Sequence, residues 1–129
     1  MIAGVGIDLV QICRIRAAVE RFGSGFLNRV FCKDEIAFCS QRKDPYPCFA
    51  ARFAAKEALV KAFGTGFSKG ITMKQMCVRK DEKGAPKIIL FGKAKEAAIS
   101  IGINNIHLSL SHEREMAAAV VILEKSEEV

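Results

Sequence analysis

The sequence predicts a single α+β domain in which a largely antiparallel sheet packs against helices. Segments with apolar residues at helical spacing fill most of the first half of the chain, whereas alternating or continuous apolar segments fill most of the second half. The 129 residues, half of them hydrophobic, suffice to bury one core. Because no internal repeat, linker or low-complexity segment interrupts this pattern, we expect one domain over residues 1–129.

A short buried strand is predicted at residues 2–9, where Ile and Val alternate with Ala and Gly. In an extended strand, Gly4, Gly6 and Asp8 share one face, so Asp8 ends a row that carries no side chains. A strand face without side chains leaves room for a bulky neighbour to lie beside the carboxylate. The alternative is that Asp8 caps the following helix, a frequent use of aspartate. This segment alone leaves both interpretations open.

Three helices are predicted next, at residues 10–22, 33–42 and 48–63. The first places apolar residues at helical spacing with arginines elsewhere on its circumference, and Gly23 and Gly25 are expected to end it. The second opens with acidic residues and closes before a proline-rich loop at residues 44–47. The third carries Arg52 and Lys56 four residues apart, which predicts a basic stripe along that helix.

The remainder of the chain is predicted to be mostly strand. Residues 73–80 and 87–91 flank a turn-forming stretch and indicate a hairpin. A short helix is expected at residues 93–101, ended by a glycine. Residues 106–112 alternate strictly, and residues 117–123 form a nearly continuous apolar run, so we expect two paired strands joined by a polar loop.

Composition narrows the function classes. The formal net charge of +6 favours an anionic partner such as a phosphate compound or an acidic protein. No basic run with interleaved aromatics suggests a nucleic-acid partner, and no apolar run is long enough to span a membrane. The five cysteines are odd in number, lack a Cys-x-x-Cys pair and predict free thiols in a reducing compartment, hence a cytoplasmic protein. The first residues lack the pattern of a signal peptide.

Residues 53–66 combine charges and glycines in a way that suits a phosphate and a hard metal ion. Glu57 and Lys61 lie four apart and therefore share one helix face. Gly64 and Gly66 follow, and their backbone can approach a ligand closely. The alternative needs no function, because a surface helix with an ion pair and a glycine cap has the same pattern.

Asp8 and Glu57 would form a partial cage for Mg²⁺ if the first strand packs beside the third helix. Lys61 would then neutralise charge on the same phosphates, and His112, at a strand end, would reach a phosphate or base from another side. Together these residues describe a phosphoryl-type transfer site. Spacing alone does not show that Asp8 and Glu57 meet.

Three ordered segments, at residues 4–8, 52–66 and 107–112, together resemble the holo-acyl-carrier-protein synthase family of small 4'-phosphopantetheinyl transferases. The resemblance implies that Asp8 and Glu57 bind Mg²⁺ with the pyrophosphate of coenzyme A, and that Glu57 and Lys61 are catalytic. It implies that a carrier-protein serine attacks the β-phosphate, which transfers phosphopantetheine and releases adenosine 3',5'-bisphosphate.

The resemblance also assigns Lys43, Arg52 and His112 to the nucleotide of coenzyme A and places Lys61 beside its pyrophosphate. The loop of Gly64, Thr65 and Gly66 is expected to lie against the nucleotide, because its glycine backbone can approach a ligand closely. His112 has an alternative role as a hairpin histidine with a structural hydrogen bond. His107 points to the opposite strand face, which favours a structural role. The general base is left open between a metal-bound water and a carboxylate such as Glu57.

The same family has properties of assembly and partner recognition that carry over as expectations. Its small members are usually homotrimers with active sites at subunit interfaces. The helix that bears Arg14 and Arg21 resembles the surface that receives the acidic acyl-carrier protein. The rival hypothesis is a non-enzymatic module whose basic face docks an acidic protein.

Overall fold

The computed structural model describes residues 1–64 and 70–126. Its elements are β1 (Ile2–Gln11), α1 (Ile12–Phe22), α2 (Ser24–Val30), α3 (Lys33–Ser40), α4 (Tyr46–Phe63), the 3-10 turn η1 (Met73–Gln75), β2 (Met76–Lys80), β3 (Pro86–Leu90), α5 (Gly92–Ser100), β4 (Ile103–His112) and β5 (Met116–Lys125). Three strands form an antiparallel sheet in the order β1-β5-β4, and β2 pairs antiparallel with β3. The α+β class is therefore confirmed.

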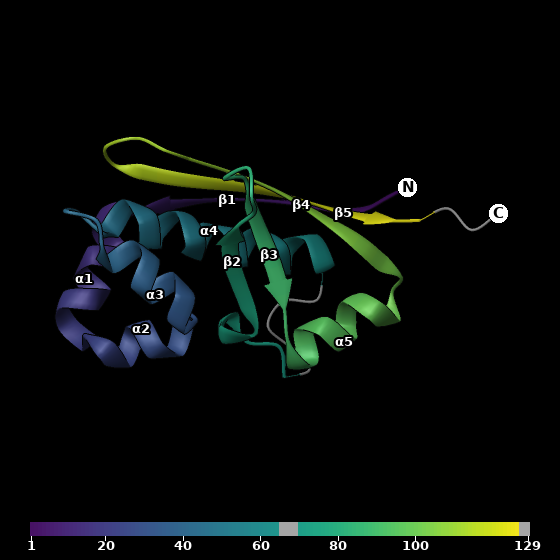
Figure 1. Ribbon diagram of the computed structural model, residues 1–129, viewed down its shortest axis with the longest axis horizontal. Coiled ribbons are helices and arrows are strands. Elements are labelled where there is room, and N and C mark those ends of the chain that lie inside the picture. The colour runs from purple at the N-terminus through teal and green to yellow at the C-terminus, as the bar shows by residue number, and fades with distance from the viewer. Residues whose placement is uncertain (65–69, 127–129) are drawn as a thin grey trace.

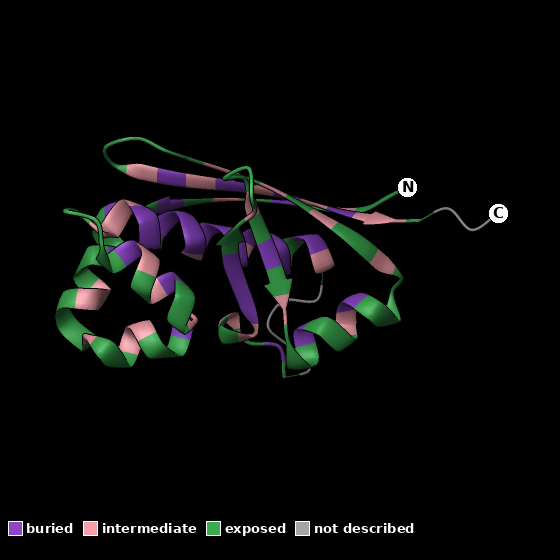
Figure 2. Ribbon diagram, viewed as in Figure 1, coloured by how far each residue is buried: buried purple, intermediate pink, exposed green. Residues whose placement is uncertain are grey.

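The helix α4 lies directly against the three-stranded sheet (Figure 1). The helices α1, α2 and α3 gather toward one end of α4, α5 lies toward the other, and the β2–β3 hairpin lies between them. Most residues of α4 are buried, as its colouring in Figure 2 shows. The surface-helix interpretation is therefore wrong for residues 53–63, since α4 is the central helix of the core.

The predicted elements differ from the observed ones at two places in particular. Gly23 ends α1 with a positive φ of 56°, as expected, but Gly25 lies inside the short helix α2, which the pattern did not predict. The strand expected from residue 73 begins only at Met76, because Thr72 and Gln75 cap a 3-10 turn first. None of the described helices is long and apolar enough to cross a membrane.

Two glycines let β1 lie against the backbone of α4. A Cβ atom at Gly6 would collide with the carbonyl oxygen of Ala58, and one at Gly4 would collide with that of Ala62. The bulky neighbour expected beside the cleared face of the strand is therefore α4 itself. Asp8 follows on that face, and this contact brings it to the helix that carries Glu57 and Lys61.

Replacing Gly6 with Ala is expected to destabilise the protein by about 3 kcal/mol, because the clash is with backbone and only a shift of β1 or α4 relieves it. Gly25→Ala is the matched control, since Gly25 is helical and a Cβ there meets nothing within 4 Å. Urea unfolding measures both variants, and their midpoints are compared provided that the dependence of the unfolding free energy on urea concentration is the same. Equal midpoints for the two variants would refute the close contact of β1 with α4.

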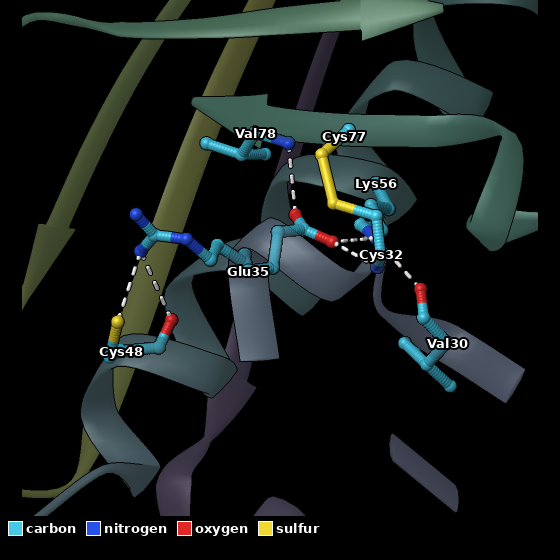
Figure 3. Close-up of polar contacts among 8 residues, drawn as sticks. Val30, Cys32, Glu35, Cys48, Lys56, Cys77 and Val78 are labelled. Carbon is cyan, nitrogen blue, oxygen red and sulfur yellow. Dashed lines mark hydrogen bonds and ion pairs between the residues drawn. A yellow bond between two sulfur atoms is a disulfide. The ribbon is translucent and has the colours of Figure 1, made fainter. Parts of the chain in front are cut away.

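A fully buried ion pair joins α3 to α4. Lys56 Nζ lies 2.6 Å from Glu35 Oε1 and donates a second hydrogen bond of 2.7 Å to the carbonyl of Val30. The Glu35 carboxylate also accepts the backbone N–H groups of Cys32 and Val78, each at 2.9 Å (Figure 3). Lys56 and Glu35 together therefore tie α2, α3, α4 and β2, and the basic stripe predicted along the helix is wrong at this position, since Lys56 is buried.

Four of the cysteines form disulfides in the structure, which differs from the expectation of free thiols. Cys32 bonds to Cys77 and Cys39 to Cys48, with Cα atoms 5.8 and 5.5 Å apart, while Cys13 is free and exposed. The partners stand 45 and 9 residues apart in the chain, and neither separation is a recognisable motif. Only the fold reveals these pairs, because it packs α3 against both β2 and the start of α4.

Candidate functional site

An acidic centre forms where β1 crosses α4. Lys61 Nζ donates to Asp8 Oδ1 at 2.8 Å and to the carbonyl oxygen of Ile7 at 3.1 Å. The side chain of Asp8 is 15% exposed and that of Lys61 is 55% exposed, so the pair lies at the rim of the contact. Lys61 thus pairs across to the strand, rather than with the neighbouring Glu57 on its own helix as the four-residue spacing suggested.

Glu57 completes this centre from the same helix. Burial raises the pKa of its carboxyl group, and the nearby charge of Asp8 raises it further, whereas Lys61 and Arg14 act in the opposite direction. The hydrogen bond to Asp8 raises the pKa of Lys61. Since Asp8 pairs with Lys61, which shares a helix face with Glu57, the packing of β1 on α4 brings both carboxylates to the same side of the helix, a placement that sequence spacing did not show. Two carboxylates held together in this way offer oxygen ligands of the kind that Mg²⁺ prefers.

A basic cavity of about 410 Å³ lies on another side of α4. Its lining comes from α3, α4, β2, β3 and β4 and includes four basic side chains: Arg42, Arg52, Lys80 and His112. Asp44 is the acidic residue in the lining, and it pairs with Arg16 at 3.7 Å. The cavity therefore carries an excess of positive charge, as an anion site requires.

Arg52 is the most deeply buried cation of this cavity, with 6% of the residue exposed. Its Nη1 donates to the sulfur of Cys48 at 3.2 Å and to the carbonyl of Cys48 at 3.5 Å. Within the described part of the chain, its Nε has no hydrogen-bond partner. Burial lowers the pKa of its guanidinium. A buried guanidinium with an unused donor is suited to bind an anionic ligand.

A single chain does not bring the acidic centre and the basic cavity together. Asp8 lies on β1 and His112 on β4, the two outer strands of the sheet, with β5 between them. On α4, Arg52 and Glu57 are five residues apart and so project roughly 140° apart around the helix. The two groups thus flank α4 on different sides.

The remaining predicted site residues are placed as follows. Lys43 is exposed between Arg42 and Asp44, which both line the basic cavity. Gly64 ends α4 with φ of 79°, and its N–H points back to the carbonyls of Val60 and Lys61. Thr65 and Gly66 lie outside the described residues.

The two arginines expected to meet a protein partner are exposed on α1. Arg14 lies near enough to Glu57 to lower the pKa of that carboxyl group, and Arg21 stacks on the ring of Phe22 at 5.2 Å. His107 pairs with Glu124 at 3.0 Å, which agrees with the structural role expected for it.

Sequence reasoning missed three residues of the basic cavity: Phe38, Arg42 and Lys80. Phe38 and Arg42 share a helical spacing of four that signals contact, but Arg42 falls just past the end of α3. Lys80 is the last residue of β2, and nothing in a two-stranded hairpin indicates which helix it faces. Only the packing of the hairpin reveals its position.

Comparison with known proteins agrees with this geometry. The family model described as the 4'-phosphopantetheinyl transferase superfamily matches residues 4–121. A holo-[acyl-carrier-protein] synthase of Halothermothrix orenii is 47% identical over 125 residues, which are 97% of this chain and 99% of that protein. The crystal structure of such a synthase from Neisseria meningitidis matches with a TM-score of 0.89 at 33% identity, and covers 97% of this chain and 100% of that one.

A synthase structure from Helicobacter pylori, solved in complex with coenzyme A, matches with a TM-score of 0.82 and 35% identity. The match covers 93% of this chain and 99% of that chain. These relatives agree over nearly their full length in both sequence and fold. The chain therefore belongs to the 4'-phosphopantetheinyl transferase superfamily, as the three ordered sequence segments indicated.

Proposed function

We infer that this enzyme transfers the 4'-phosphopantetheine group of coenzyme A to a serine of an apo acyl-carrier protein. The transfer releases adenosine 3',5'-bisphosphate and activates the carrier for fatty acid biosynthesis. One observation carries the inference in this chain: the acidic centre of Asp8, Glu57 and Lys61 accompanies a basic cavity with a buried, under-partnered arginine. The first suits a metal-bound pyrophosphate, and the second suits a phosphorylated nucleotide.

The acidic centre fits Mg²⁺, because its donors are oxygens and the charges of its two carboxylates are only partly offset by Lys61 and Arg14. Asp8 and Glu57 would hold the ion, which when bound would stabilise negative charge on the pyrophosphate. Lys61 is half exposed and lies beside both carboxylates. Its ammonium group can therefore stabilise negative charge that develops on the leaving phosphate.

The nucleotide end of coenzyme A is assigned to the basic cavity. Arg52 and His112 line it, and Lys43 stands exposed at its rim beside Arg42. Gly64, Thr65 and Gly66 follow Lys61 closely in the chain, which supports their assignment to the nucleotide. Arginine and histidine give charged donors for phosphate oxygens, so the cavity selects a nucleotide that carries an additional phosphate group.

We further propose a homotrimer whose active sites lie between subunits. Val5, Ile7 and Leu9 are 59–64% exposed on β1 and lie beside Val120 and Ile122 of β5 in the strand register. An exposed apolar sheet face of this kind is typical of an interface between subunits. A closed ring of subunits would also place the acidic centre of one chain against the basic cavity of its neighbour, which a single chain cannot do.

A complementation experiment tests this arrangement. Glu57→Gln inactivates the acidic half, and the double variant Lys43→Ala/His112→Ala weakens the nucleotide half. When equal amounts of the two chains are mixed and reassembled, random trimers should recover about a quarter of parental activity, since each site needs one intact half from each chain. Activity no higher than that of the separate variants would refute shared sites. Light scattering should give three times the chain mass of 14.1 kDa.

The carrier protein is assigned to α1. Arg14 and Arg21 are exposed there, and Arg14 lies close to the acidic centre where the carrier serine must react. An acidic carrier would be steered to this surface by charge, so Arg14→Ala/Arg21→Ala is expected to weaken carrier binding more at low salt than at high salt.

We place the enzyme in the cytoplasm, where both of its substrates must be available together. In that reducing compartment the four bonded cysteines are expected to become thiols. Acid quenching of freshly lysed cells, followed by alkylation at neutral pH in denaturant and by intact mass measurement, tests this. Modification of all five cysteines supports the cytoplasmic location, whereas modification of Cys13 alone indicates that the disulfides persist and contradicts it.

The transfer itself is tested by incubating the enzyme with coenzyme A, Mg²⁺ and an apo acyl-carrier protein. The carrier should gain the mass of one phosphopantetheine group, and a carrier whose acceptor serine is replaced by alanine should not. Added chelator should stop the gain in mass, and excess Mg²⁺ should restore it. Carrier binding without any gain in mass, under all metal conditions, would favour a non-enzymatic docking module and overturn the inference.

A further inference from the structure

We propose that Phe38 is a positioning residue that holds three cations, Arg42, Arg52 and Lys80, in place for the 3'-phosphate of coenzyme A. This inference rests on the proposed function and goes beyond it, because it concerns how the cavity distinguishes coenzyme A from its dephosphorylated form. Phe38 itself has no group that can bind a phosphate. Its expected effect therefore acts entirely through the side chains on its ring.

The ring of Phe38 is a common neighbour of these three cations. The guanidinium carbons of Arg42 and Arg52 lie 4.9 and 4.7 Å from the ring centroid, and Lys80 Nζ lies 5.0 Å from it. All three distances fall within the range of a cation–π contact. The cations come from the segment after α3, from α4 and from the end of β2, so Phe38 is the feature that they share.

Bringing three positive charges to one ring is unfavourable unless an anion joins them. Burial lowers the pKa of the Arg52 guanidinium, the charge of Glu35 raises it, and the like charge of Arg42 lowers it. Asp44, the acid of the cavity lining, is engaged with Arg16, and the Nε of Arg52 has no partner among the described residues. The positive charge that remains at the ring is best satisfied by a doubly charged group with several acceptor oxygens, as in a phosphate monoester.

The cation–π contacts account for why these side chains stay together before a ligand arrives. Phe38 is half-buried and packs against the hydrophobic core, and this contact restrains its ring. Arg42 and Lys80 are exposed chains that would otherwise spread into solvent to reduce their mutual repulsion. Because the ring already holds them at the cavity, these side chains lose less conformational entropy when a phosphate binds.

The test replaces Phe38 with Leu, which retains an apolar core contact but removes the ring. We expect KM for coenzyme A to rise by about 10-fold, through loss of several cation–π contacts, while kcat changes little. KM for dephospho-coenzyme A should stay within about 2-fold of the parent, because that substrate lacks the group that the three cations bind. Phe38→Tyr keeps the ring and should restore the parental preference.

Calorimetry with adenosine 3',5'-bisphosphate and with 5'-AMP provides a readout that is independent of turnover. Phe38→Leu, Arg42→Met and Lys80→Met should each weaken binding of the bisphosphate and leave that of 5'-AMP unchanged. Lys95→Met, which removes one exposed charge on α5 outside the cavity, is the charge-matched control and should alter neither. Circular dichroism and urea unfolding identify any variant that has lost its fold.

The two levels of inference fail in different ways. If the parent protein neither binds coenzyme A nor modifies the carrier, the proposed function is wrong. If the parent prefers coenzyme A to its dephosphorylated form and folded Phe38→Leu retains the same preference, the function stands and the role of Phe38 is refuted. Equal losses for both substrates in Phe38→Leu would also refute it, since that result indicates a general packing defect.

Discussion

Replacing Glu57 with glutamine is expected to reduce transfer at least about 100-fold, while the metal-free protein becomes equally or more stable. The loss corresponds to about 3 kcal/mol of transition-state stabilisation, a modest share of what a metal ion supplies to a phosphoryl site. The expected gain in stability of the metal-free variant has a separate cause. Burial and the charge of Asp8 both raise the pKa of the Glu57 carboxyl group, so its ionised form is disfavoured in the folded chain.

The sign of the stability effect follows from this raised pKa. A carboxyl group whose pKa is higher in the folded than in the unfolded state contributes stability when protonated, and this contribution is lost as the pH rises through the folded pKa. At neutral pH, the neutral glutamine therefore removes an unfavourable charge. Thermal unfolding in chelator at neutral pH should show a Tm equal to or above that of the parent.

Glu96→Gln is the control for Glu57→Gln, because Glu96 is an exposed helical glutamate that pairs with Lys93 at 3.6 Å on α5. It should leave both turnover and Tm essentially unchanged. Asp8→Asn should share the loss of turnover, since both carboxylates are assigned to the metal ion. A Glu57→Gln enzyme with parental turnover in saturating Mg²⁺ would refute the assignment, and a large fall in its Tm would show a structural role instead.

The second large effect concerns the buried ion pair. Glu35→Gln is expected to cost about 3–5 kcal/mol of the free energy of unfolding, because it leaves the ammonium of Lys56 in the core without a counter-charge. Burial already lowers the pKa of Lys56, and Glu35 is the group that opposes this. Since a domain of this kind is stable by only about 5–15 kcal/mol, the variant should melt far below the parent.

Two comparisons separate this effect from an ordinary loss of charge. Asp34→Asn removes the acidic partner of an exposed ion pair, in which Arg79 Nε lies 3.0 Å from Asp34, and should cost at most about 1 kcal/mol. The double variant Glu35→Gln/Lys56→Met removes both buried charges and should be more stable than Glu35→Gln alone. Urea unfolding measures all three, and equal costs for Glu35→Gln and Asp34→Asn would contradict the buried pair.

Much of the fold was predictable because each main element has a local pattern. The alternation in β4, the continuous apolar run of β5 and the apolar spacing of the long helix α4 are all visible in the order of the residues. The short helix α2 was missed, since seven residues beginning near two glycines carry too little periodicity to be recognised. Its position depends on packing against neighbouring elements.

The candidate site was predictable in its chemistry and only partly in its arrangement. The predicted group of Asp8, Glu57 and Lys61 lies where β1 meets α4, although spacing paired Lys61 with Glu57 and the fold pairs Lys61 with Asp8. The placement of His112 away from Asp8 depends on strand order, which puts β1 and β4 on opposite edges of the sheet. Strand order is a long-range property, and no local pattern of residues encodes it.

The glycine contact between β1 and α4 has a consequence for how this site can vary. The distance between β1 and α4 is set by direct contact of the Gly6 backbone with the Ala58 backbone, with no side chain between them. This contact determines where Asp8 lies relative to the helix. Side chains elsewhere in the core can therefore be substituted and repacked without moving the Asp8 carboxylate relative to Glu57. Gly4 and Gly6 therefore fix where Asp8, a proposed metal ligand, lies against α4, and substitutions toward new acyl groups or carriers belong on the surrounding surface.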